Sequence, residues 1–191
     1  MQHIENYLEN YLGIRGTDLS PVVRLFEHTT LRKNEYLLKV NQYARCISFV
    51  KTGYLRVFAF DQDGNKEITQ WISNQDMFIT DLASFVFEAP SRWNIQALSD
   101  CELYTISKEN YQRIDTYVNN WPELKMFFIA KCFVTLENRV FEQLSMTAAQ
   151  KVKQLLDTNP ELFIQVPLHY IASMLGMPPE TLSRVRRQLL S

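Results

Sequence analysis

The chain has 191 residues, of which 46% are hydrophobic and 21% charged, and its formal net charge is −1. This is the composition of a globular protein with room for one domain of ordinary size and a small second one. No apolar run is long enough to span a bilayer and no basic-then-apolar leader opens the chain, so we expect a cytoplasmic protein without a membrane partner. Cys46, Cys101 and Cys132 are widely spaced and odd in number, which argues against a disulfide framework, a zinc site or an iron–sulfur cluster.

The first part of the chain changes character near residue 31. Residues 1–30 are predicted to be mostly helical, because apolar side chains recur at helical spacing from Ile4 to Leu12. From Leu31 to about Ile106, short β-rich runs alternate with turn residues, and Gly64 supplies the tight turn of one hairpin. The candidate strands are Glu35–Leu38, Cys46–Lys51, Tyr54–Phe60, Glu67–Ile72, Asn94–Leu98 and Glu102–Ile106. This pattern predicts an antiparallel barrel or jelly roll.

A long helix is predicted from Trp121 to about Ser145, with two adjacent apolar stripes. The first stripe holds Phe127, Ala130, Val134 and Phe141, and the second holds Ile129, Phe133, Leu136, Val140 and Leu144. Together they are wider than the single stripe of about 100° that one core requires. We therefore expect this helix to pack on its own barrel on one side and on a second copy of itself on the other. Phe127, Val134 and Phe141 repeat every seven residues, as in a coiled-coil seam, and are the predicted dimer contacts. The alternative is a helix buried within a monomer.

The C-terminal region is typical of a helix-turn-helix. Thr147 is the expected N-cap of a helix that ends before Asn159-Pro160. A short helix follows with Ile171, Ala172 and Leu175 facing inward, and Gly176 can take the positive φ that ends it. A second helix is predicted after Pro178-Pro179, with a buried stripe of Leu182, Val185 and Leu189.

The opposite face of that second helix suits DNA. Arg184 and Arg187 can donate two hydrogen bonds to guanine, and Glu180 can accept from cytosine, while Thr181 and Ser183 can serve a base or a phosphate. Residues 147–191 hold five Lys and Arg against three acids, whereas the rest of the chain is net negative. The alternative is an ordinary helical hairpin with a solvated polar face.

In this order, short helices, a β-roll, a long helix and a helix-turn-helix, the chain resembles the Crp/Fnr family of bacterial transcription factors. The clearest points are the stretch Phe49–Val57, the Asp63-Gly64 turn and the segment Gly176–Arg184. Trp121–Leu124 and Asn159–Leu162 resemble the short members common in Bacteroidetes.

The resemblance implies an α+β fold: a sensory double-stranded β-helix, or jelly roll, of the cyclic-nucleotide-binding type at 1–120, a dimerisation helix at 121–145 and a DNA-binding domain at 146–191 that lacks a full wing. It also implies a homodimer on a near-palindromic site, with RNA polymerase as a possible protein partner. Glu180, Thr181, Ser183 and Arg184 stand at the reading positions, with Arg187 beyond them.

The stretch equivalent to the family's phosphate-binding cassette departs from its pattern. Thr80 replaces the glycine, Asp81 shortens the carboxylate, and Ser91-Arg92 inverts the expected order of a cation and a hydroxyl. Thr80, Asp81, Leu82, Ser91 and Arg92 remain the candidate ligand-pocket residues. Because a cyclic phosphate needs a cation and backbone amides at close range, we expect no cyclic-AMP binding, and no other cofactor or metal is predicted.

One other function class remains open, and an enzyme is not expected. The chain could be a ligand-binding module whose C-terminal helices contact a protein instead of DNA. An enzyme, such as a cupin-like oxygenase, would need two or three histidines inside the barrel. His3, His28 and His169 all lie outside the predicted β region, so no catalytic residue is assigned.

Overall fold

The computed structural model describes residues 2–190, except for the side chains of Gln2, His3, Asn10, Tyr11, Thr17 and Leu190. The chain forms two compact units. The first unit comprises Met1–Ala59 and Ile72–Lys131, and the second comprises Phe60–Trp71 and Cys132–Ser191. None of the helices within the described range has the length and apolar character needed to cross a membrane.

The first unit begins with a helical segment. It contains α1 (Gln2–Tyr7), a π-helical turn (Leu8–Leu12), a 3-10 turn (Gly16–Asp18) and α2 (Leu19–Val23). Ile4 and Leu8 are buried, as the helical spacing of apolar residues predicts. Tyr7 packs edge-on against Phe49 and Phe78, with ring centroids 5.0 and 4.8 Å apart, and so joins this segment to the sheet region.

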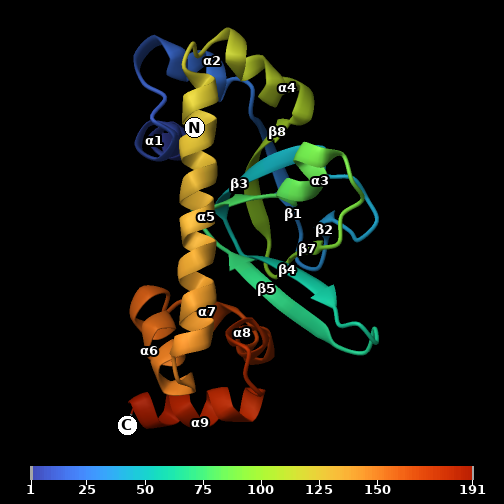
Figure 1. Cartoon of the computed structure of the whole chain (residues 1–191), viewed down its shortest axis with the longest axis vertical. Helices are drawn as coiled ribbons and strands as arrows, with labels where there is room; N and C mark the ends of the chain where they lie inside the picture. The colour runs from blue at the N-terminus through green and yellow to red at the C-terminus, as the bar shows by residue number, and fades with distance from the viewer. Residues whose placement is uncertain (1, 191) are drawn as a thin grey trace. The chain divides into compact units, whose positions relative to one another are not determined.

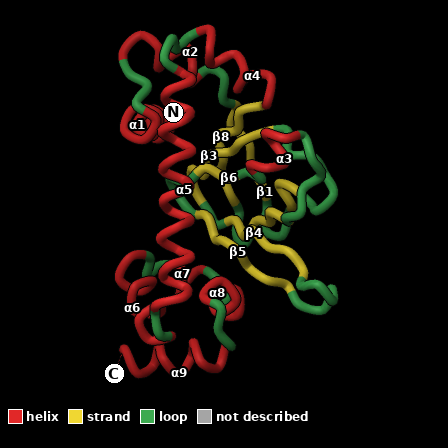
Figure 2. The backbone as a smooth tube through the Cα atoms, viewed as in Figure 1, coloured by secondary structure: helices red, strands yellow, loops and turns green. Residues whose placement is uncertain are grey.

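Two four-stranded sheets form the β-roll (Figures 1 and 2). One runs β1 (Glu27–Leu31), β8 (Cys101–Ser107), β3 (Cys46–Thr52), β6 (Phe78–Ile79). The other runs β2 (Tyr36–Leu38), β7 (Asn94–Ala97), β4 (Leu55–Phe60), β5 (Glu67–Ser73). The pairs β1–β8, β3–β8, β3–β6, β2–β7 and β4–β7 are antiparallel. Phe49, Leu55, Ile95 and Leu103 are fully buried and form the centre of its core. The predicted antiparallel roll is confirmed.

Several elements of the roll were not predicted. They are β1, β6, α3 (Leu82–Phe87) and α4 (Lys108–Arg113), which is followed by a 3-10 turn at Ile114–Thr116. Because β1 starts at Glu27, the β region begins earlier than predicted and does contain His28, contrary to the sequence analysis. That histidine is exposed and lies 3.0 Å from the carboxylate of Glu102. One exposed histidine does not supply the two or three ligands of a cupin-type site.

The long helix α5 runs from Trp121 to Ser145. The prediction that one of its apolar stripes packs on the roll is wrong. The half-buried face instead holds Leu124, Phe128, Cys132, Arg139 and Gln143, following the fully buried Trp121. Both predicted stripes are open: exposed fractions are 62% at Phe127, 51% at Val134, 70% at Phe141 and 43–83% along the second stripe. In a single chain, α5 therefore presents one wide apolar face.

The second unit gathers four helices around the C-terminal end of α5 (Figure 1). They are α6 (Ala148–Thr158), α7 (Leu162–Gln165), α8 (Leu168–Leu175) and α9 (Pro179–Leu190). Thr147 caps α6 as predicted: its hydroxyl accepts from the Gln150 amide, while the Gln150 side chain accepts from the Thr147 amide. The tip of the β4–β5 hairpin, with Gly64 at φ 71°, belongs to this unit.

Candidate nucleic-acid interface

The turn between α8 and α9 is fixed by backbone geometry. Gly176 has φ 69°, a conformation that costs other residues a Cβ clash. Its amide donates to the Ser173 carbonyl, and the next amide, of Met177, donates to the Ala172 carbonyl. This pair of bonds is the Schellman pattern, which satisfies carbonyls at the end of a helix. Pro179 then opens α9, where a missing amide hydrogen has no cost.

The apolar undersides of α8 and α9 hold the two helices together. Ile171, Ala172 and Leu182 are fully buried, and Leu175 and Val185 are 9% and 6% exposed. Leu189 was predicted to continue the buried stripe of α9, but it is 39% exposed. The buried stripe therefore ends one turn earlier than predicted.

The opposite face of α9 is free. Glu180, Arg184 and Arg187 are exposed, and Thr181 and Ser183 are partly exposed. Within the range that the structure describes, none of these five side chains takes part in a hydrogen bond or ion pair with another residue. Two guanidinium groups, one carboxylate and two hydroxyls are thus available on one helix to a partner outside the chain.

Side chains of α5 form hydrogen bonds to the C-terminal end of α8. Arg139 and Gln143 each donate to the Met174 carbonyl over 3.4 Å, and this carbonyl lies in the last turn of α8, where no intrahelical donor is available. The Arg139 guanidinium also stacks on Trp71, 4.5 Å from the ring centroid, and burial lowers the pKa of this group from its usual value. Lys151 donates to the Gln143 side chain over 2.6 Å, so its ammonium group is engaged within the protein.

The backbone of strand β5 contacts helix α8 at Ser173. The Thr69 amide donates to the Ser173 hydroxyl over 2.9 Å, and that hydroxyl faces the Glu67 carbonyl at 3.4 Å. Sequence reasoning assigned no role to Ser173 or Arg139. Arg139 is one of several charged residues of α5, and Ser173 is one small polar residue of α8, so nothing in the local sequence marks either of them.

The candidate ligand-pocket residues divide into two groups. Asp81 caps α3 by accepting from the Ser84 amide, and its second oxygen accepts from the Ser91 hydroxyl over 2.7 Å, with both side chains at most 5% exposed. Thr80 donates to the Cys46 carbonyl. Arg92 is exposed instead and stacks on Trp93, 4.7 Å from the ring centroid.

Of the five candidates, Asp81 and Ser91 are thus brought together, without Arg92. Leu82 is 38% exposed on α3. A hollow of about 400 Å³ lined by Thr80 contains Arg45 as its one cationic side chain, counting the residues that the structure describes. Arg92, the candidate cation of the cassette, therefore does not line this hollow. The Asp81 carboxylate already accepts hydrogen bonds from the Ser84 amide and the Ser91 hydroxyl.

Comparisons with known proteins agree with this architecture. Residues 28–115 match the family model of the cyclic nucleotide-binding domain. No curated protein sequence matches the chain. FixK2 from Bradyrhizobium japonicum has a similar structure, with a TM-score of 0.71 and 18% identity over 86% of this chain and 84% of that protein.

Two further solved structures cover still more of the chain. A protein assigned to the Crp/Fnr family of transcriptional regulators from Eubacterium rectale gives a TM-score of 0.69 and 17% identity, over 97% of this chain and 88% of that one. The catabolite activator protein of Thermus thermophilus gives 0.59 and 17%, over 96% and 86%. The chain therefore has the Crp/Fnr-like fold, with a cyclic nucleotide-binding-like domain followed by C-terminal helices.

Proposed function

We propose that this protein is a sequence-specific DNA-binding transcriptional regulator. The observation that carries the proposal is the free polar face of α9, in which Glu180, Arg184 and Arg187 are exposed while Leu182 and Val185 anchor the helix from beneath. A helix presented in this way fits the major groove, and these side chains match the hydrogen-bonding edges of the bases. The solved structures of similar fold include the Eubacterium rectale protein assigned to the Crp/Fnr family of transcriptional regulators, which supports the same interpretation.

We further propose that it acts as a homodimer paired through α5. The apolar face of this helix is too large to be left in water, since Phe127, Phe133, Phe141 and Leu144 are each at least 59% exposed in the single chain. Pairing two copies along the repeat of Phe127, Val134 and Phe141 covers it. A two-fold axis then presents two copies of α9, which calls for a near-palindromic site with half-sites about one helical turn apart.

The roll of this regulator is proposed not to bind cyclic AMP. Asp81 and Ser91 already satisfy each other, and Arg92 stacks on Trp93. Binding a cyclic phosphate through the cassette residues would require breaking the buried Ser91–Asp81 hydrogen bond and moving Arg92 away from Trp93.

Replacing Arg184 with Ala tests the role of α9. We expect the affinity for the cognate site to fall by about 1–3 kcal/mol, with relaxed base preference at one position of each half-site. Arg24→Ala is the matched control, because Arg24 is an exposed arginine in the first unit and its loss changes the net charge equally. Equal losses for both variants would mean that only general charge attraction is measured. If the unaltered chain binds no DNA sequence selectively, its C-terminal helices contact a protein instead.

A further inference from the structure

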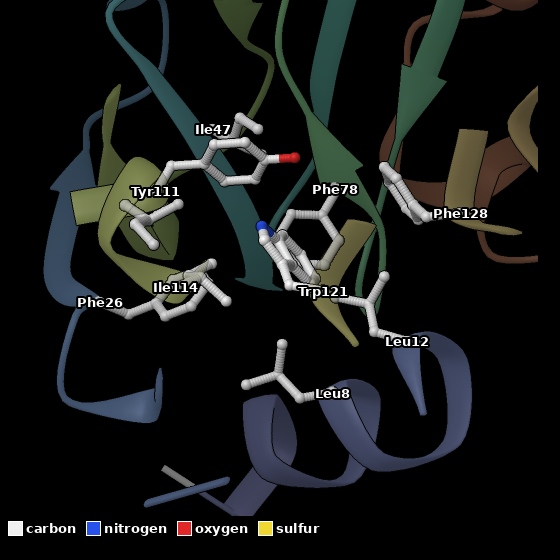
Figure 3. A pocket seen from close by; sticks show the side chains of 10 residues that line it. Leu8, Leu12, Phe26, Ile47, Phe78, Tyr111, Ile114, Trp121 and Phe128 are labelled. Atoms are coloured by element: carbon white, nitrogen blue, oxygen red, sulfur yellow. The ribbon is translucent and has the colours of Figure 1, made fainter. Parts of the chain in front are cut away.

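The first unit contains an apolar cavity of about 30 Å³ away from the hollow beside Thr80 (Figure 3). The N-terminal segment, strands β3, β6 and β8, the α4 region and the start of α5 all contribute to its wall. Every lining side chain is aliphatic or aromatic, and Leu8, Leu12, Phe78 and Phe128 are among them. Tyr111 and Trp121 alone bring a polar side-chain atom to this wall, which is formed of described residues throughout.

Trp121 carries an unused hydrogen-bond donor at this cavity. The side chain is 2% exposed, and its Nε1 is the one buried side-chain nitrogen or oxygen without a hydrogen-bond partner in the described part of the chain. Figure 3 shows the indole among the lining side chains, with its nitrogen turned toward Tyr111. An unpartnered buried donor is costly and uncommon in folded proteins.

Neither of two simple explanations satisfies this donor fully. The Tyr111 ring lies 5.6 Å from the Trp121 ring at an angle of 70°, so its face can accept only a weak N–H···π contact. A water molecule would fit, but buried waters make about three hydrogen bonds, and this wall offers at most two polar atoms. An occupant that is apolar except for one acceptor atom matches the wall better than water does.

We propose that this cavity is a binding site for a small apolar molecule with a single oxygen acceptor, of the class of short ketones, aldehydes and alcohols, whose oxygen accepts from Trp121 Nε1. The volume is two to three times the roughly 10–15 Å³ that one water requires, so the occupant has few non-hydrogen atoms. For four such atoms, the limit on binding energy per atom sets a dissociation constant no tighter than about 40 µM. The site is therefore suited to a small metabolite present at micromolar to millimolar concentration.

Leu8 and Leu12 place a wide helical turn in the wall of the cavity. Both residues belong to one π-helical turn that ends at Gly13, with φ 77°, and this segment is part of neither sheet. Wide helical turns of this kind are frequent at functional sites. On the other side, Trp121 is the first residue of α5 and Phe128 lies two turns further along it, so an occupant touches the beginning of the long helix. An effect of this ligand on DNA binding would rest on the function proposed above. The binding of the ligand in the cavity does not depend on that function.

Indole N–H resonances of the full-length chain test occupancy directly. The chain has three tryptophans, and the variants Trp71→Phe and Trp93→Phe identify which signal belongs to Trp121. Acetone is the probe, and isobutene, which has nearly the same shape but no oxygen, is its matched control. We expect acetone to shift the Trp121 N–H signal downfield in a saturable way and to leave the Trp71 and Trp93 signals in place.

The variant Trp121→Phe separates the hydrogen bond from the apolar fit. Loss of one neutral hydrogen bond should weaken acetone binding about three- to tenfold and leave isobutene binding unchanged. Trp93→Phe, a change of the same size elsewhere in the unit, should alter neither. The comparison of acetone with isobutene needs only the unaltered chain, so it stands even if Trp121→Phe does not fold.

Three results would overturn the assignment. If acetone does not change the chemical shift of the Trp121 indole N–H, then acetone does not enter the cavity. A signal that responds to isobutene but not to acetone shows an apolar void in which Nε1 takes no part. A signal that already exchanges magnetisation with a trapped water, and keeps that water in acetone, shows a structural hydration site. None of these results depends on whether the protein binds DNA.

Discussion

Truncating Phe141 to Ala should separate the proposed dimer. A fully buried phenylalanine side chain is stabilised by about 1.5–3 kcal/mol relative to water. Because Phe141 is 70% exposed in the single chain, about 1–2 kcal/mol of this is available to pairing in each copy. A two-fold axis places the residue twice, so Phe141→Ala should cost the dimer about 2–4 kcal/mol and raise its dissociation constant about 30- to 1000-fold.

The chain offers a matched control for that measurement. Phe87, on α3, is 77% exposed, so Phe87→Ala removes an equally exposed aromatic side chain that does not belong to α5. Sedimentation equilibrium over a range of protein concentrations gives both dissociation constants. Operator affinity should fall with dimerisation in Phe141→Ala and not in Phe87→Ala. Equal behaviour of the two variants would remove α5 from the interface, as would persistent dimers with intact DNA binding in Phe141→Glu or Val134→Glu.

Three further predictions concern the turn, the roll and the alkaline limit of stability. Gly176→Ala should lower the free energy of unfolding in urea by about 1–2 kcal/mol, and Gly176→Asn should lower it by less, because asparagine tolerates a positive φ better than alanine does. A new Cβ at this position meets the Gln143 side chain at an ordinary 3.5 Å, so equal losses for the two variants would point to crowding instead of backbone strain. Ser91→Ala should cost about 1–3 kcal/mol by leaving Asp81 short of a buried hydrogen bond, and millimolar cyclic AMP should leave the Tm of the unaltered chain unchanged; a dose-dependent rise in Tm would refute the assignment of the cassette. Burial, followed by the charge of Asp115, raises the pKa of Tyr111 to about 12, so the folded chain keeps this proton where the unfolded chain, with an ordinary value of 10, loses it. Stability contributed by Tyr111 is therefore complete below pH 10 and declines as the pH rises toward 12, and Tyr111→Phe should flatten this part of the urea-midpoint profile relative to the unaltered chain.

The strands of the roll could largely be predicted because alternation and turn residues mark them locally. Predicted and observed bounds of β3, β4, β5, β7 and β8 differ by one residue at most at either end. Strand β1 could not be found this way, since Glu27, His28 and Thr30 are all exposed and give no apolar alternation. Its strand character comes from pairing with β8, which is distant in sequence.

The inward face of α5 was misassigned for a related reason. Periodicity measures how many apolar residues share a face, and the widest apolar face of α5 is the exposed one. The half-buried face includes Arg139 and Gln143, whose long side chains cover surface with their stems while their polar ends bond to α8. Sequence alone also could not show that Asp81 and Ser91, ten residues apart, would satisfy each other.

Helix α9 was the part of the candidate site best specified by local sequence. Gly176 and Pro179 fix its start, and the spacing of Leu182 and Val185 decides which side of α9 faces solvent. The exposure of Leu189 is set by tertiary packing, which the spacing of apolar residues along one helix does not specify.

Selection of bound sequences from a pool of random DNA, at two salt concentrations, tests the central proposal most directly. A pair of exposed α9 helices related by a two-fold axis should enrich a near-palindrome whose half-sites lie about one helical turn apart. The enrichment should survive higher salt, although overall affinity falls as phosphate contacts are screened. A pool that shows no enriched sequence at either salt concentration would contradict the account.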